Sequence, residues 1–77
     1  MERVQMGVIG VGRMGARHAR NLAGSVSGAR VIALADPDRV ARERLREELG
    51  VPYSFDDWRE LVHLNEVDAV VIATPVE

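Results

Sequence analysis

A glycine-rich segment near the amino terminus has the residue types and spacing to hold a phosphate group. The letters GVGRMG, which begin at Gly10, carry glycine at the first, third and sixth positions. Gly10 permits a tight turn, Gly12 has no side chain to keep the backbone from a pyrophosphate, and Gly15 lets a helix pack closely on a sheet. The N–H groups around Arg13 and Met14, together with the helix dipole, favour an anion there. The segment predicts a pyrophosphate site.

A single carboxylate follows at the distance that a dinucleotide site needs. Asp36 comes about 20 residues after Gly15, at the end of the next apolar run. It is expected to accept hydrogen bonds from the adenosine ribose and to repel a 2′-phosphate, which favours NAD over NADP. Capping of the next helix is an alternative role for Asp36, and it is compatible with binding. Arg39 keeps NADP open as the less favoured cofactor, because an arginine there can hold a 2′-phosphate.

The elements that must position these residues follow from apolar runs that alternate with helix-period stretches. Strands are predicted at residues 4–9, 30–35, 51–53 and 67–73, and helices at 13–23, 36–49 and from about 57 to 62. Strands alternating with helices predict an α/β fold with a parallel sheet and right-handed crossovers. This βαβαβαβ pattern is typical of a Rossmann-type sheet with strand order 3-2-1-4.

Other polar and aromatic residues have structural interpretations. Pro37 is expected in the first turn of the second helix, and Ser54–Asp57 resembles a capping box that opens the third. Tyr53 and Trp58 are expected to cover one edge of the core. The arginines of the second helix, interleaved with glutamates, predict a solvated face of ion pairs. They are Arg39, Arg42, Arg44 and Arg46.

The composition of the 77 residues excludes several classes of function. The net charge is −2, all ten basic residues are arginine, and cysteine is absent. No basic nucleic-acid surface is therefore expected, and His18 and His63 without a cysteine make no metal site. The first apolar stretch is too short for an export signal or a membrane span, so the cytoplasm is the expected location.

Three segments taken together resemble the start of the Gfo/Idh/MocA family of oxidoreductases. They are the glycine motif continued as ARHA with His18, the letters ALADPD that contain Asp36, and DAVVIATP between Asp68 and Pro75. The resemblance covers nearly the whole chain. It implies a nicotinamide-dependent enzyme that oxidises or reduces a sugar, an inositol or a related polyol.

The resemblance also implies which parts of such an enzyme lie within residues 1–77. Thr74 and Pro75 would lie in the loop that lines the ribose and nicotinamide side of the cofactor. The Glu-Lys-Pro motif of the family has no counterpart here, and no lysine exists to replace its proton-handling lysine. We therefore expect a truncated, partial dinucleotide-binding domain without its substrate domain, with no catalytic residue and no activity alone.

Two functions and one mode of association follow as hypotheses. The first function is the NAD(P)-binding portion of the oxidoreductase, and the alternative is a non-catalytic NAD(P) sensor or accessory module. The order 3-2-1-4 leaves the fourth strand as an open edge, and the crossovers place two helices on one face and one on the other. A homo-oligomer is therefore expected, as a two-fold dimer across that edge or the under-covered face.

Overall fold

The computed structural model describes residues 3–24 and 27–73. Strands and helices alternate along these residues. In chain order they are β1 Val4–Ile9, α1 Arg13–Gly24, β2 Ala29–Ala35, α2 Arg39–Leu49, β3 Tyr53–Phe55, α3 Trp58–Val62 and β4 Ala69–Ile72. The described helices include none that is long and apolar enough to span a membrane.

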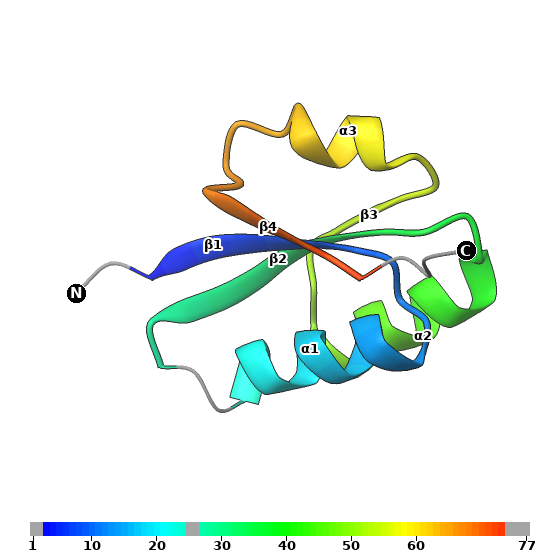
Figure 1. The fold of residues 1–77 in the computed structure, drawn as a ribbon, viewed down its shortest axis with the longest axis horizontal. Coiled ribbons are helices and arrows are strands. Elements are labelled where there is room, and N and C mark those ends of the chain that lie inside the picture. Colours follow the sequence, from blue (N-terminus) through cyan, green and yellow to red (C-terminus); the bar gives the residue numbers. More distant parts are fainter. Residues whose placement is uncertain (1–2, 25–26, 74–77) are drawn as a thin grey trace.

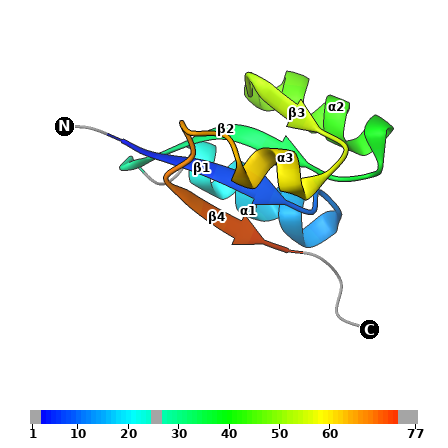
Figure 2. The ribbon, with the colours of Figure 1, turned by 90° about the horizontal axis from the view of Figure 1, so that it is seen from above.

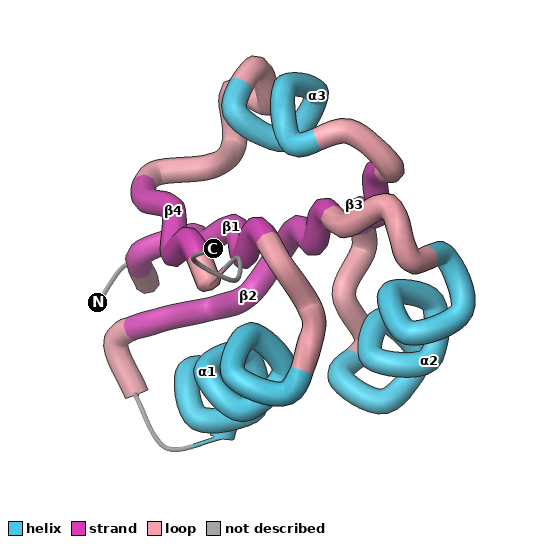
Figure 3. Tube along the Cα trace, turned by 45° about the vertical axis from the view of Figure 1, so that its right-hand side comes forward, coloured by secondary structure: helices cyan, strands magenta, loops and turns pink. Residues whose placement is uncertain are grey.

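The four strands form one parallel sheet in the order β3-β2-β1-β4, as predicted. Helices α1 and α2 cover one face of this sheet and α3 covers the other (Figure 1; Figure 3). This division follows from right-handed crossovers, because the sheet grows in one direction from β1 to β3 and in the other at β4. The predicted α/β Rossmann-type fold is confirmed.

Each face of the sheet has its own apolar cluster. On the α1–α2 side, the buried residues are Val8, Val11, Ala19, Val31, Leu34, Leu45 and Val51. On the α3 side, they are Ile9, Ile32, Ala33, Ala35 and Leu61. Neighbouring strand residues point to opposite faces, and a shift in the β1–β2 register between Met6 and Gly7 places Ile32 and Ala33 in the same cluster. Because both faces are covered, β2 is buried almost throughout.

Leu61 joins the short helix α3 to the sheet. Its side chain is fully buried. A Cβ on Gly7 of β1 would lie 2.5 Å from Leu61 Cδ2. Glycine at position 7 therefore makes room for α3 to pack directly on β1.

The second helix begins later than predicted. Its N-cap is Asp38, whose side chain accepts a hydrogen bond from Ala41 N at 3.1 Å. Pro37 therefore precedes the helix, and its placement in the first helical turn was wrong. The reason is local, because Asp36 Oδ1 accepts from Asp38 N at 2.7 Å and makes a turn that competes with helix. The helix ends at Gly50 with φ 66°, the left-handed conformation that glycine permits.

The third strand also differs from its prediction. It spans Tyr53–Phe55 and pairs with β2, so Ser54 is a strand residue and the predicted capping box does not form. Asp57 alone caps α3, where its Oδ1 accepts from Arg59 N at 2.9 Å. Because they pair with β2, Ser54 and Phe55 adopt an extended conformation, although the local sequence pattern predicts a helix start there.

β4 lies at the edge of the sheet beside β1 (Figure 2). Ile72 pairs in register with Ile9, a residue of the α3-side cluster, yet Ile72 is 70% exposed. Val70 is also exposed. The expected deficit of cover over β4 is therefore present among the described residues.

Candidate dinucleotide-binding site

The glycine loop connects β1 to α1 at the carboxyl end of the sheet. Gly10 has a φ of 92°, a backbone conformation that residues with a side chain rarely adopt. Its N–H donates to Ala35 O at 2.8 Å, which extends the pairing of β1 with β2 to this point. The tight turn predicted at Gly10 is present.

The remaining glycines of the loop have different reasons for being glycine. A Cβ on Gly15 would collide with the carbonyl oxygen of Gly10, so a side chain there would push α1 away from the loop. A Cβ on Gly12 would meet nothing within 4 Å, and the φ of Gly12 is not positive. Neither backbone strain nor packing among the described residues requires glycine at position 12. The open space beside its backbone is what a pyrophosphate needs.

The start of α1 adds positive potential next to this space. Ala16 N donates to Gly12 O at 2.8 Å, and the N–H groups of Arg13 and Met14 precede the hydrogen-bond ladder of the helix. No acidic residue occupies the first turn of α1, and the side chains of Arg13 and Met14 are exposed. The helix dipole is thus available to an anion at this end.

Asp36 directs its carboxylate at the glycine loop. Its Oδ2 accepts from Val11 N at 2.8 Å, and its Oδ1 accepts from Asp38 N. The cap of α2 is Asp38, so the alternative role of Asp36 as that cap was wrong. Each carboxylate oxygen can accept a second hydrogen bond. Asp36 therefore retains acceptor capacity for ribose hydroxyls beside the glycine loop.

A small recess of about 80 Å³ adjoins Asp36. It lies at the carboxyl ends of β1 and β2, and most of its wall is apolar. The lining residues are Ile9, Gly10, Ala35, Asp36, Pro37, Asp56 and Trp58. Tyr53 packs against the apolar cluster on the α3 side as expected, whereas Trp58 is half-exposed and lines this recess. Sequence reasoning missed the recess, because Trp58 and Ile9 meet only through the packing of α3 on the sheet.

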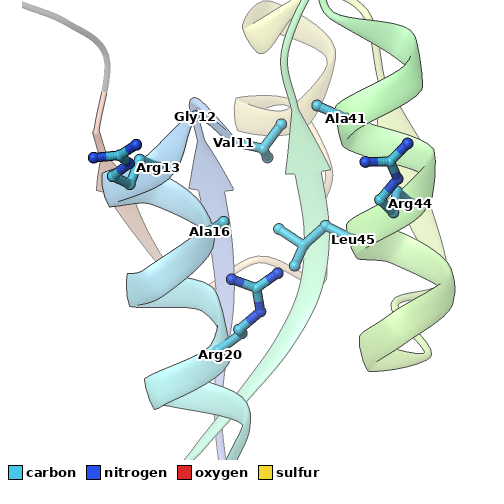
Figure 4. A pocket seen from close by; sticks show the side chains of 8 residues that line it. All are labelled: Val11, Gly12, Arg13, Ala16, Arg20, Ala41, Arg44 and Leu45. Carbon is cyan, nitrogen blue, oxygen red and sulfur yellow. The ribbon is translucent and has the colours of Figure 1, made fainter.

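A larger groove of about 330 Å³ lies between α1 and α2 (Figure 4). Arg13, Arg20 and Arg44 border it. Arg20 holds Glu48 through two hydrogen bonds of 2.7 and 3.0 Å, and this pairing lowers the pKa of Glu48. Asp36 does not line the groove. Gly12 and Arg13 of the glycine loop line the groove and not the recess. The smaller recess is the better candidate for the adenosine end of a dinucleotide, because Asp36 lines it and because parallel α/β sheets bind ligands outside the carboxyl ends of their strands.

Arg42 is not part of the solvated face predicted for α2. It is only 5% exposed. Its Nη1 donates to Asp36 O and to Asp56 Oδ1, both at 2.6 Å, and its Nε donates to Ser54 Oγ. The prediction was wrong for this arginine because acceptors in β3 and in the loops that follow β2 and β3 surround it. Ser54 in turn donates to Glu43, which also accepts from Arg46 Nε at 2.8 Å.

The structure brings six of the eight predicted cofactor-binding residues to one end of the sheet. They are Gly10, Gly12, Arg13, Met14, Gly15 and Asp36. Thr74 and Pro75 lie outside the described residues.

The sheet order, the glycine loop and the placed aspartate define a dinucleotide-binding Rossmann domain. The family model described as "Oxidoreductase family, NAD-binding Rossmann fold" matches residues 4–77. The chain therefore belongs to the Gfo/Idh/MocA family, and the resemblance stated from the sequence motifs is confirmed.

Individual relatives agree with this assignment. Scyllo-inositol 2-dehydrogenase (NAD(+)) of Bacillus subtilis (strain 168) is 39% identical over 72 residues, which cover 94% of this chain and 21% of that protein. Inositol 2-dehydrogenase 1 of Saccharopolyspora erythraea is 44% identical over 73 residues, which cover 94% of this chain and 22% of that protein. The chain thus spans about a fifth of the length of these relatives.

A solved structure carries the same fold with its ligands bound. Scyllo-inositol dehydrogenase from Lactobacillus casei, with bound NAD(H) and scyllo-inositol, matches with a TM-score of 0.91 and 31% identity. The match covers 96% of this chain and 22% of that chain. The described backbone is therefore similar to one that belongs to an NAD(H)-bound dehydrogenase.

Proposed function

We propose that this chain binds the adenosine diphosphate half of NAD as the cofactor-binding part of an oxidoreductase that acts on inositol or a related polyol. The observation that carries the proposal is the open space at Gly12. That glycine is unexplained by strain or by packing among the described residues, and a closely approaching pyrophosphate explains it.

Each residue of the site has a role in this proposal. The backbone at Gly12 and the N–H groups of Arg13 and Met14 bind the pyrophosphate, while Gly10 and Gly15 shape the loop. Asp36 accepts from the adenosine ribose, and the apolar recess beside it receives the adenine. A 2′-phosphate would meet the carboxylate of Asp36, so NAD is the preferred cofactor. When bound, the nicotinamide accepts or donates a hydride.

The remaining parts of the proposal come from the family. Thr74 and Pro75 would line the ribose and nicotinamide side of the cofactor. The substrate domain would be formed by sequence other than residues 1–77, since these span about a fifth of the relatives. The inositol or polyol substrate is proposed because the relatives are inositol dehydrogenases by name, and a cytoplasmic location is proposed with it.

Gly12→Ala tests the proposal, and Gly24→Ala is its matched control. Both glycines have open space where a Cβ would be added, and neither has a positive φ. Neither substitution should therefore unfold the chain. In calorimetric titrations with NAD, we expect wild type and Gly24→Ala to bind alike and Gly12→Ala to bind at least about tenfold more weakly, or roughly 1.4 kcal/mol. Equal affinity of all three chains for NAD, or no binding by wild type, would contradict the proposal.

A two-fold homodimer is a further part of this proposal. Exposed Val70 and Ile72 lie on β4, the open edge strand, and a strand edge with apolar side chains favours pairing with another chain. Sedimentation equilibrium at high micromolar concentration should show a dimer. A folded monomer under these conditions would exclude it.

A further inference from the structure

Arg42 is a charged side chain buried in the middle of α2. It is the only buried charged side chain among residues 3–24 and 27–73. Burying a guanidinium is costly unless hydrogen bonds replace its water. Its partners therefore indicate what this arginine holds in place.

Glu43 of α2 lies 3.5 Å from Arg42 Nε as an ion-pair partner, and the hydrogen-bond acceptors of Arg42 lie in β3 and directly after β2 and β3. Nη1 donates to the backbone carbonyl of Asp36, directly after β2, and to the carboxylate of Asp56, directly after β3. Nε donates to Ser54 in β3. Asp36 and Asp56 both line the recess, so one guanidinium donates hydrogen bonds to two of the residues that form its wall.

The backbone of Asp36 is held from both sides. Its N–H donates to Phe55 O at 3.1 Å, and its carbonyl accepts from Arg42. With the backbone fixed, the carboxylate reaches Val11 N in the glycine loop and Asp38 N. The direction of this carboxylate therefore depends on a contact made by α2.

We propose that Arg42 is a positioning residue of the dinucleotide site. It holds Asp36 so that the carboxylate faces the glycine loop, and it holds Asp56 at the rim of the recess. It thereby sets the affinity for NAD and the preference for NAD over NADP. This inference rests on the proposed function.

Lysine cannot replace Arg42 in this role. The planar guanidinium donates in several fixed directions, whereas an ammonium is a single point charge on a flexible stem. Arg42→Lys keeps the charge but cannot reach Ser54, Asp36 and Asp56 together. Arg46→Lys is the matched control, since Arg46 is also on α2 and binds Glu43 but not Asp36.

The experiment is calorimetric titration of wild type, Arg42→Lys and Arg46→Lys with NAD and with NADP. We expect Arg42→Lys to weaken NAD binding about tenfold and NADP binding less, while Arg46→Lys binds as wild type does. In an Asp36→Ala chain, Arg42→Lys should cause a smaller further loss than it does alone, because the part of its effect that passes through the Asp36 carboxylate is already gone and only the part through Asp56 remains. Unchanged NAD binding by Arg42→Lys, or an equal loss with and without Asp36, would overturn the inference.

Amide hydrogen exchange separates this inference from the proposed function, because it needs no ligand. The N–H groups of Val11 and Asp38 donate to the Asp36 carboxylate. In Arg42→Lys they should exchange faster relative to the slowest core amides, and in Arg46→Lys they should not. Unchanged protection would overturn the positioning role, whereas failure of wild type to bind NAD would overturn only the proposed function.

If Arg42→Lys fails to fold, Ser54→Ala is the decisive variant in both measurements. It removes the acceptor of Arg42 Nε and leaves Asp36 itself intact. A smaller loss of NAD affinity and of Val11 protection is expected in the same direction. No change in either would overturn the inference.

Discussion

Of two Gly→Ala substitutions in the same helix, one should destabilise the chain and the other should not. Gly15 and Gly24 are both residues of α1. A Cβ on Gly15 would collide with the Gly10 carbonyl oxygen and lie 2.6 Å from its carbon, whereas a Cβ on Gly24 would meet nothing within 4 Å. Because the obstacle at position 15 is backbone, it cannot move aside as a flexible side chain would.

The magnitude follows from two opposing effects. Alanine favours a helix over glycine by about 1 kcal/mol, and an added methyl group in a tightly packed site costs about 1–3 kcal/mol. At Gly15 the collision with backbone brings the upper end of that cost, so a net loss of about 1–2 kcal/mol is expected. A chain of 77 residues has a total stability of roughly 4–12 kcal/mol, so this loss is substantial.

Thermal denaturation followed by circular dichroism measures both variants. A loss of 1–2 kcal/mol should lower the Tm of Gly15→Ala by roughly 5–15 °C in a domain of this size. Gly24→Ala should raise the Tm by a few degrees or leave it unchanged. Gly15→Ala should also weaken NAD binding, since α1 and the glycine loop must separate. A Tm for Gly15→Ala at or above that of wild type would refute the close approach of Gly15 to Gly10.

Three more outcomes are expected. Asp36→Ala should lower the affinity for NAD and reduce discrimination against NADP, and calorimetry showing both unchanged would remove Asp36 from the site. The Ser54 hydrogen bond, followed by that of Arg46, lowers the pKa of Glu43 from its ordinary 4.5 to about 2. Because the folded pKa is the lower one, the stability that Glu43 contributes is present above about pH 4.5 and is lost as the pH falls toward 2. Urea denaturation between pH 6 and 2.5 should show a weaker loss of stability in Glu43→Gln, and equal pH profiles would count against the Ser54 contact. The 77-residue chain should form no NADH from NAD with myo- or scyllo-inositol, because it contains no lysine to handle the proton. Substrate-dependent absorbance at 340 nm would contradict this expectation.

The sequence alone determined the fold class, the strand order and most of the candidate site. Apolar runs separated by helical stretches leave few parallel arrangements, since right-handed crossovers restrict how strands follow one another. The glycine spacing and the position of Asp36 also predict the local backbone geometry of the site. A tight turn at Gly10, a close approach at Gly15 and an acid at the end of β2 each need a particular residue at a particular place in the chain.

Only the tertiary structure decided the features that depend on distant residues. Arg42 has the pattern of a solvated helix residue, and it is buried because Asp36, Ser54 and Asp56 bring acceptors to it. Ser54 extends as a strand because β2 offers an edge.

The recess beside Asp36 is decided in the same way. It forms because Leu61 anchors α3 over Gly7, which places Trp58 near the end of β1. Pairing and packing between segments far apart in the sequence outweigh local preferences of a fraction of a kcal/mol per residue. For that reason the geometry of the glycine loop could be predicted from the sequence, whereas the walls of the recess and the burial of Arg42 could not.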